Sequence, residues 1–136
     1  MNNDKNNIGL QQNSKVMVVD DDNDIATLVR MALQRNGFEN VFAFTDPLLA
    51  LEHFKLNHED YSLVISDIRM PGLNGFEFAE YLSKVKPEIK VILMSAFDIN
   101  SVKNFKYSSN ISGLIQKPIS PKKLAKIVAG TKVIGV

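Results

Sequence analysis

Carboxylates, a hydroxyl and a lysine each follow a short apolar run of this sequence. Three aspartates, Asp20 to Asp22, follow the first run, Asp67 follows the third, Ser95 the fourth and Lys117 the fifth. Converging carboxylates repel one another unless a hard cation lies among them, and Mg²⁺ prefers such oxygen ligands. A lysine and a hydroxyl supply charge and hydrogen bonds to phosphoryl oxygens. The set indicates phosphoryl transfer, in which an already ionised aspartate serves as the nucleophile.

The apolar runs have the pattern of strands buried on both faces of a parallel sheet. The first, residues 16–19, is Val-Met-Val-Val, an uninterrupted and largely β-branched segment. Stretches with apolar residues at helical spacing separate the runs. The predicted strands are residues 16–19, 41–44, 63–65, 91–94 and 111–115. The predicted helices lie at residues 25–33, 76–85, 99–105 and 121–128, and a further helix has Pro47 in its first turn, carries His53 and ends near His58. Five alternating units predict an α/β fold, a doubly wound five-stranded parallel sheet flanked by five helices.

Local signals set the ends of several helices. Gly37 is expected to cap the first helix, Asp46 and Pro47 to open the second, and Pro87 to end the third. The order of the strands cannot be read from the sequence. In any doubly wound sheet, however, ligands bind outside the carboxyl ends of the strands, which is where the polar residues fall.

Composition narrows the class of protein. The chain has 136 residues, a formal net charge of +1 and no cysteine, which excludes disulfides, thiolate metal sites and broad electrostatic attraction to nucleic acid. No apolar run approaches the roughly 20 residues that cross a bilayer. We therefore expect a cytoplasmic protein without direct nucleic-acid or membrane contact. Residues 1–14 are expected to form a flexible tail, 15–130 one domain and 131–136 a short extension.

Four separated motifs resemble those of the receiver domains of two-component signalling. They are Val-Val-Asp-Asp-Asp at 18–22, Asp-Ile-Arg-Met-Pro-Gly-Leu-Asn-Gly at 67–75, Ser-Ala at 95–96 and Lys-Pro at 117–118. The resemblance covers about residues 15–130 and implies the (βα)5 receiver fold of response regulators, similar to that of chemotaxis regulators.

The resemblance also implies roles for individual residues in a phosphoprotein of a phosphorelay. Asp67 would be the phosphoacceptor, Ser95 and Lys117 would contact the phosphoryl group, and Mg²⁺ would be held by Asp20, Asp21, Asp67 and the Arg69 backbone carbonyl.

The implied partner that donates the phosphoryl group is a histidine kinase or a histidine phosphotransfer protein. The domain would catalyse its own phosphorylation and dephosphorylation, and Ser95 would move toward the new aspartyl phosphate. This movement would reshape the surface of the fourth helix, fifth strand and fifth helix, where a homodimer is a further expectation. No output domain is evident in the sequence, so we expect action on an unidentified protein target. A stand-alone regulator and part of a longer protein both remain open.

Three positions depart from, or refine, the family pattern. Receivers commonly carry Tyr or Phe three residues before the lysine, but this chain has Leu114, so transmission must use another side chain or backbone shifts. Phe97 and Arg69 fall two residues after Ser95 and Asp67, where they would border the phosphoryl group. A bulky apolar Phe97 predicts slow hydrolysis of the phosphorylated state.

Ordinary structural explanations exist for each residue taken alone. Asp20 to Asp24 could simply cap a helix, Asp67 could be a turn residue, and Lys117 a solvated lysine. Joint placement after successive strands outweighs these explanations. His53 and His58 are expected at the surface without a role. The lysines of the last helical region form either a solvated face or a docking surface: Lys117, Lys122, Lys123, Lys126 and Lys132.

Two other functions were weighed. A haloacid-dehalogenase-like phosphatase also uses a strand-end aspartate, a hydroxyl, a lysine and Mg²⁺, and Asp20 and Asp22 superficially match its motif. That family, however, calls for Thr or Val at position 24, where this chain has Asp24, and for a late acidic pair that is missing. A phosphorylation-independent module with a receiver fold is disfavoured by the intact acidic residues.

Overall fold

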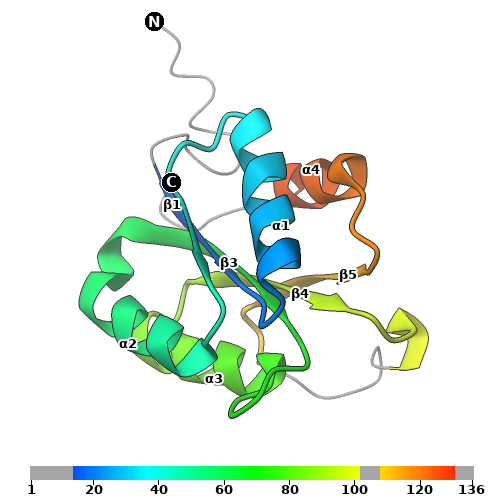
Figure 1. The fold of residues 1–136 in the computed structure, drawn as a ribbon. Helices are drawn as coiled ribbons and strands as arrows, with labels where there is room; N and C mark the ends of the chain where they lie inside the picture. Colours follow the sequence, from blue (N-terminus) through cyan, green and yellow to red (C-terminus); the bar gives the residue numbers. More distant parts are fainter. Residues whose placement is uncertain (1–13, 102–107, 131–136) are drawn as a thin grey trace, which may run out of the picture.

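The computed structural model describes residues 14–101 and 108–130, which form one parallel sheet covered by helices on both faces (Figure 1). The strands are β1 (Lys15–Val19), β2 (Val41–Phe44), β3 (Tyr61–Asp67), β4 (Lys90–Ser95) and β5 (Ile111–Gln116). The α-helices are α1 (Asn23–Arg35), α2 (Pro47–Asn57), α3 (Gly75–Val85) and α4 (Pro121–Ala129), and η2 (His58–Asp60) and η3 (Ile99–Ser101) are short 3-10 helices. The predicted α/β architecture is confirmed.

Within the described residues, four α-helices are present where the sequence predicted five in the whole chain. The fourth predicted helix was expected at residues 99–105, but residues 99–101 form the single 3-10 turn η3, and 102–107 lie outside the described residues. Apolar residues recur there only three times, too few to specify a long helix. The last predicted helix is present and is labelled α4. The predicted tail at 1–13 and extension at 131–136 also lie outside the described residues, so these boundaries stay predictions.

The strand order is β2-β1-β3-β4-β5, which the sequence left open. The chain passes from β1 outward to β2 and then returns to place β3 on the other side of β1. A crevice opens at the carboxyl ends of the two strands where the order reverses. Val19 pairs with Ser66 in register, so the residues that follow β1 and the end of β3 are neighbours at that crevice.

Two apolar layers hold the helices to the sheet, as Figure 1 shows with α2 and α3 on one face and α1 and α4 on the other. Met17, Val64 and Leu93 point into the layer under α2 and α3, whereas Val18 and Ile65 point into the layer under α1 and α4. Successive residues of a strand point to opposite faces, so a strand covered on both faces is apolar throughout. The central strands thus form a rigid base for their carboxyl ends.

Side chains cap the helices where the sequence predicted. Asp22 accepts hydrogen bonds from the backbone N–H groups of Asp24 and Ile25, and Asp46 accepts one from Leu48 at the start of α2. Gly37, at φ 96°, takes the left-handed conformation that ends α1. Asn74 and Glu77 form a reciprocal capping box at the start of α3. These local bonds fix where each helix leaves the crevice.

His53 does not lie free at the surface as predicted. Its half-buried ring nitrogen Nε2 lies 2.7 Å from the Tyr61 hydroxyl, between α2 and β3. Burial, followed by the charge of Asp60, raises the pKa of Tyr61 to about 12, so the hydroxyl stays protonated at neutral pH. His53 and His58 lie away from the strand ends that carry the site, and His53 packs as part of the core.

None of the helices within the described residues has the length and apolarity needed to cross a membrane.

Gly75 allows α3 to begin directly against the end of β3. Its N–H donates to the Ile68 carbonyl at 2.8 Å. A Cβ at this position would lie 2.5 Å from the Asp67 carbonyl oxygen and 2.9 Å from Ile68 Cα, both backbone atoms that cannot rotate away. A side chain here would therefore push α3 away from the strand that ends in Asp67.

We predict that Gly75→Ala lowers the free energy of unfolding by about 1–3 kcal/mol, the range for overpacking a close contact. Urea denaturation measures the change. Gly130→Ala is the matched control, because its Cβ would meet its nearest atom, the Lys126 carbonyl oxygen, at an ordinary 3.5 Å. Equal stabilities of Gly75→Ala and the unmodified chain would show that the contact is not restrictive.

Candidate functional site

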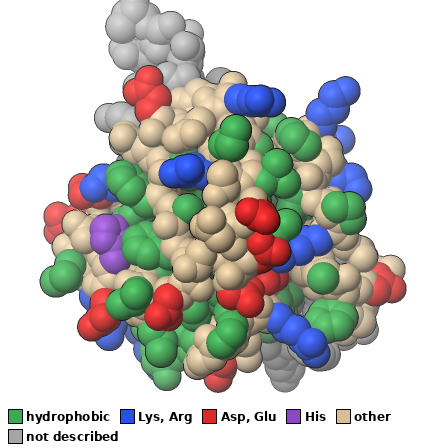
Figure 2. Space-filling view, viewed as in Figure 1, with side chains coloured by type: hydrophobic (Ala, Val, Ile, Leu, Met, Phe, Trp, Pro, Cys, Tyr) green, Lys and Arg blue, Asp and Glu red, His purple; other side chains and the backbone are tan. Residues whose placement is uncertain are grey.

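Three aspartates meet where β1 and β3 end. Asp20 follows β1 and is fully buried, Asp67 ends β3 with only 7% of its surface exposed, and Asp21 is exposed at the rim. One carboxylate oxygen of each lies within 4.8 Å of the others. Acidic side chains gather near the middle of the face shown in Figure 2, beside Lys and Arg side chains. The structure thus brings together the three side chains expected to hold a metal.

Lys117 lies between the two buried carboxylates. Its Nζ atom is 2.8 Å from Asp20 Oδ2 and 3.3 Å from Asp67 Oδ2. The sheet register carries it there, because the Lys117 N–H donates to the Ser95 carbonyl at 2.7 Å and so continues the pairing of β5 with β4. The predicted lysine is therefore an ion-pair partner and not a solvated surface residue.

Opposing effects act on the pKa values of Asp67 and Lys117. Burial is the largest cause that raises the pKa of Asp67, and the charge of Asp20 raises it further, while Lys117 and the Ile68 N–H lower it in part. Burial lowers the pKa of Lys117, but its hydrogen bond and ion pair with Asp20, together with Asp67, outweigh burial and leave that pKa raised. Ionising Asp67 in this crevice therefore costs folding free energy, and a further cation would reduce that cost.

Ser95 is buried at the end of β4 and faces the same crevice. Its hydroxyl accepts a hydrogen bond from the Phe97 N–H at 3.0 Å and donates one to the Phe97 carbonyl at 3.3 Å. No hydrogen bond between Ser95 and Asp67 occurs among the described residues. The hydroxyl therefore faces the same crevice as the Asp67 carboxylate but is bonded to its own loop.

A cavity of about 150 Å³ opens beside Asp67. Its lining combines the site residues with the two loops that follow β3 and β4: Asp67, Ile68, Arg69, Ser95, Ala96, Phe97 and Lys117. The guanidinium carbon of Arg69 lies 4.4 Å from the centroid of the Phe97 ring, a cation–π contact that joins these loops across the cavity. Arg69, Phe97 and Lys117 thus all border the space beside Asp67.

The donor set fits Mg²⁺. Carboxylate oxygens are its preferred protein ligands, and it usually binds to one or two carboxylates while retaining several waters. Asp21, at the exposed rim, leaves room for those waters, and Asp20 and Asp67 carry the buried charge that a cation would neutralise. The role predicted for the Arg69 carbonyl stays a prediction.

Two further expectations concern the acidic cluster that follows β1 and the lysines of the last helical region. Asp22 caps α1 while Asp20 turns into the crevice, so helix capping accounts for Asp22 and not for Asp20. Lys122, Lys123 and Lys126 are exposed on α4. Lys132 lies outside the described residues, and the choice between a solvated face and a docking surface stays open.

Sequence reasoning gave Gly75 and Ser66 no role, although both support Asp67. The Ser66 hydroxyl donates to the Asp67 carbonyl at 2.9 Å from a fully buried position. A serine inside an otherwise apolar run was the available signal for such a bond, since a buried hydroxyl needs a partner. The close approach at Gly75 had no comparable signal, because it depends on where α3 packs.

Leu114 lies on β5 and is partly buried against the core beneath α2 and α3. An aliphatic side chain at this position has no aromatic ring that could turn between the core and the surface. The described aromatic residue that lines the cavity is instead Phe97.

Comparisons with known proteins agree with this geometry. The family model described as the response regulator receiver domain matches residues 16–129. The putative two-component response regulator ARR21 of Arabidopsis thaliana is 35% identical over 82% of this chain, and the transcriptional regulatory protein PhoP of Bacillus subtilis is 30% identical over 82%. These alignments cover only 18% and 45% of the two relatives' own lengths.

A solved structure shares the fold. The chemotaxis response regulator CheY4 of Vibrio cholerae has a TM-score of 0.72 and 27% identity, with 83% of this chain and 93% of that chain covered.

We predict that Asp67→Asn raises the free energy of unfolding at neutral pH without divalent cations, by about 1 kcal/mol, the usual size of a single-residue effect. A raised carboxyl pKa means that the folded state binds the proton more tightly. Stability therefore falls as pH rises from the ordinary pKa to the raised one, and the full cost persists above it.

Urea denaturation at several pH values measures this difference, which should shrink at acidic pH. Asp60→Asn is the matched control, because Asp60 is an exposed aspartate that also contacts a lysine, Lys15, at 3.4 Å. A lower stability of Asp67→Asn at neutral pH would show that attraction to Lys117 exceeds burial and repulsion.

Proposed function

The chain belongs to the response-regulator receiver family of two-component signalling, and we propose that Asp67 is its phosphoacceptor. Phosphorylation on aspartate is general to this family. The observation that carries the choice of residue is the single cavity that Asp67 shares with Lys117 and Ser95 at the carboxyl ends of β3, β4 and β5. Asp20 is also buried there, but it is not among the residues that line this cavity, whereas Asp67 is.

Transfer needs no general base. An ionised Asp67 oxygen attacks the phosphorus of the donor, the new P–O bond forms, and the P–N bond of a donor phosphohistidine breaks as its electron pair returns to the ring nitrogen. Lys117, already 3.3 Å from Asp67 Oδ2, lies where the negative charge of the phosphoryl oxygens increases. Arg69 and Phe97 limit the approach of water from the cavity side.

Asp20, Asp21 and Asp67 are the side chains that would hold Mg²⁺, together with the Arg69 carbonyl. When bound, the ion stabilises the charge of the transferring phosphoryl group. Receiver domains generally bind Mg²⁺ in an acidic pocket, and the three carboxylate oxygens within 4.8 Å support the same ligands here. Lys117 contacts the Asp67 carboxylate at 3.3 Å, and Asp20 in turn binds Lys117 at 2.8 Å.

Family membership supports the remaining parts of the proposal. The donor is a histidine kinase or a histidine phosphotransfer protein, the domain catalyses its own phosphorylation and dephosphorylation, and the protein acts in the cytoplasm on a protein target. The proposed homodimer surface uses the fourth predicted helix, residues 99–105, and not the helix labelled α4. This surface includes residues that lie outside the described part of the chain.

Phosphorylation by acetyl phosphate tests the acceptor. Incubation of the chain with acetyl phosphate and Mg²⁺ should produce a slower band on a phosphate-affinity gel, because the donor supplies the group without a kinase. Asp67→Asn should give no slower band, and excess chelator should suppress the band of the unmodified chain. Asp60→Asn, at an exposed site far from the cavity, is the control and should shift normally.

Two results would contradict the proposal. A slower band that persists in Asp67→Asn would mean that another residue accepts the phosphoryl group. Absence of a slower band in the unmodified chain would mean that acetyl phosphate does not phosphorylate the protein. Turnover of small phosphomonoesters that Asp20→Asn abolishes would instead favour the phosphatase alternative. Partner binding that is unaffected by Asp67→Asn would favour a phosphorylation-independent module.

Phe97 should prolong the phosphorylated state. We expect Phe97→Ala to lose the phosphoryl group roughly ten times faster, a change of about 1.4 kcal/mol in the barrier, because water reaches the cavity more easily. The decay of the slower band after removal of acetyl phosphate measures the lifetime. Phe42→Ala removes a comparably exposed ring outside the cavity and should leave the lifetime unchanged. Rapid decay of the unmodified chain that is equal in Phe97→Ala would contradict the shielding role.

A further inference from the structure

Phe97 is held in place by Ser95 and Arg69. Its backbone N–H donates to the Ser95 hydroxyl oxygen at 3.0 Å, and its carbonyl accepts the hydrogen of that hydroxyl at 3.3 Å. Its ring is covered by the Arg69 guanidinium at 4.4 Å. Both partners line the cavity beside Asp67, so whatever fills the cavity competes for them.

The Ser95 contact cannot survive a hydrogen bond to a phosphoryl oxygen. A serine hydroxyl has one hydrogen and can donate it to only one acceptor at full strength. A doubly charged phosphoryl group is a stronger acceptor than a neutral carbonyl, because hydrogen bonds to ionised groups are shorter and stronger. The Phe97 carbonyl therefore loses its donor when Ser95 turns toward the cavity.

The Arg69 contact competes in the same way. A cation–π contact at a partly exposed site is weak, whereas a guanidinium binds phosphoryl oxygens through two directed, charge-assisted hydrogen bonds. Arg69 follows Asp67 by two residues and lines the same cavity. A phosphoryl group on Asp67 thus draws the guanidinium away from the ring.

Phe97 is suited to carry this change to the surface. With 43% of its surface exposed, it extends from the cavity to solvent at the start of the segment that follows β4. Leu114, at the position where receivers commonly have an aromatic ring, is packed against the core.

We infer that Phe97 is the aromatic side chain whose position responds to phosphorylation in this protein, since Ser95 and Arg69 release its backbone and its ring for the same phosphoryl group. The inference rests on the proposed function, because it requires the phosphoryl group on Asp67. Phe97 is in this sense a positioning residue: it holds the Ser95 hydroxyl and the Arg69 guanidinium in their resting places, and it moves when they leave.

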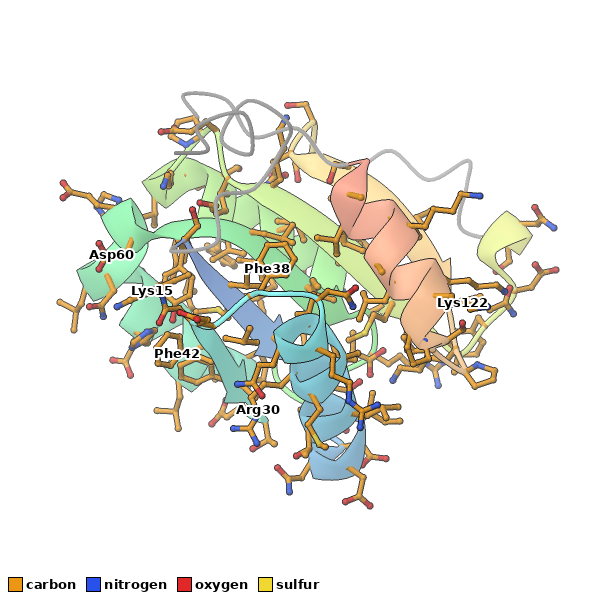
Figure 3. All side chains as sticks on the ribbon, turned by 90° about the horizontal axis from the view of Figure 1, so that it is seen from above. Lys15, Arg30, Phe38, Phe42, Asp60 and Lys122 are labelled. Atoms are coloured by element: carbon orange, nitrogen blue, oxygen red, sulfur yellow. The ribbon has the colours of Figure 1, made fainter. Side chains whose placement is uncertain are left out.

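A single tryptophan can report the movement, because the chain contains none. Phe97→Trp should show a red shift of its fluorescence emission on addition of acetyl phosphate and Mg²⁺, because the ring loses the guanidinium that covers it and becomes more exposed to water at the edge of the cavity. Phe42→Trp is the matched control: Phe42 is 40% exposed and lies beneath the Lys15 ammonium at 5.3 Å, outside the cavity (Figure 3). Its emission should not change.

The Arg69 contribution is tested in the same background. Arg69→Gln added to Phe97→Trp should shift the emission to the red before acetyl phosphate is added, and should reduce the further response. An undiminished response would overturn the part of the inference that concerns Arg69.

Labelling with fluorophenylalanine avoids reliance on the substituted chain. The unmodified protein contains eight phenylalanines, and the resonances of Phe97 and Phe42 are assigned by the loss of one signal in Phe97→Leu and in Phe42→Leu. The Phe97 resonance should move on phosphorylation while the Phe42 resonance stays fixed.

The phosphate-affinity gel is run on the same samples. A slower band with an unmoved Phe97 resonance overturns this inference and leaves the proposed function intact. No slower band contradicts the proposed function, and the inference falls with it.

Discussion

One ammonium group lies between two carboxylates that the fold has removed from water. Lys117 Nζ is 2.8 Å from Asp20 and 3.3 Å from Asp67, and without it the charges at the ends of β1 and β3 would face each other across a buried crevice. Loss of Lys117 would leave two buried carboxylates unpaired, and an unpaired buried charge is far more costly than an exposed one. The compensation is incomplete, since the pKa of Asp67 remains raised. That residual strain favours any ligand that brings positive charge to the acceptor.

The sheet makes this arrangement rigid. The carboxylates follow β1 and β3, whose side chains are almost all buried, so the backbones of these strands cannot shift without disturbing two apolar layers. Lys117 follows β5, where Leu114 packs against one layer and Ile115 lies in the other. The Ser95 hydroxyl and the Arg69 guanidinium, by contrast, lie where loops begin and bond to Phe97 through weaker contacts. Rigid charges and movable donors therefore meet in one cavity, and a phosphoryl group would change the donors without altering the charges' positions.

The strands and several helix ends could be predicted from the sequence, because they depend on residues that are close together in the chain. Apolar runs specified the strands, and Asp22, Asp46 and Gly37 specified helix ends, since capping bonds connect residues only a few positions apart. The helix predicted at residues 99–105 had few apolar residues to support it, and residues 99–101 form a 3-10 turn. The contact of His53 with Tyr61 could not be predicted, because it joins a helix to a strand and no sequence pattern shows which strand a helix contacts.

The sequence by itself determined which chemical groups follow each strand, and with them the family and the type of chemistry. Residue type and strand periodicity are local properties, and the parallel alternation requires these groups to share one edge of the sheet. Only the tertiary structure decided the strand order, the pairing of Asp20 with Lys117 across 97 positions, the approach of Gly75 to Asp67, and the contact of Arg69 with Phe97. Each of these depends on register and packing between segments distant in the chain, which are fixed only when the two apolar layers close together.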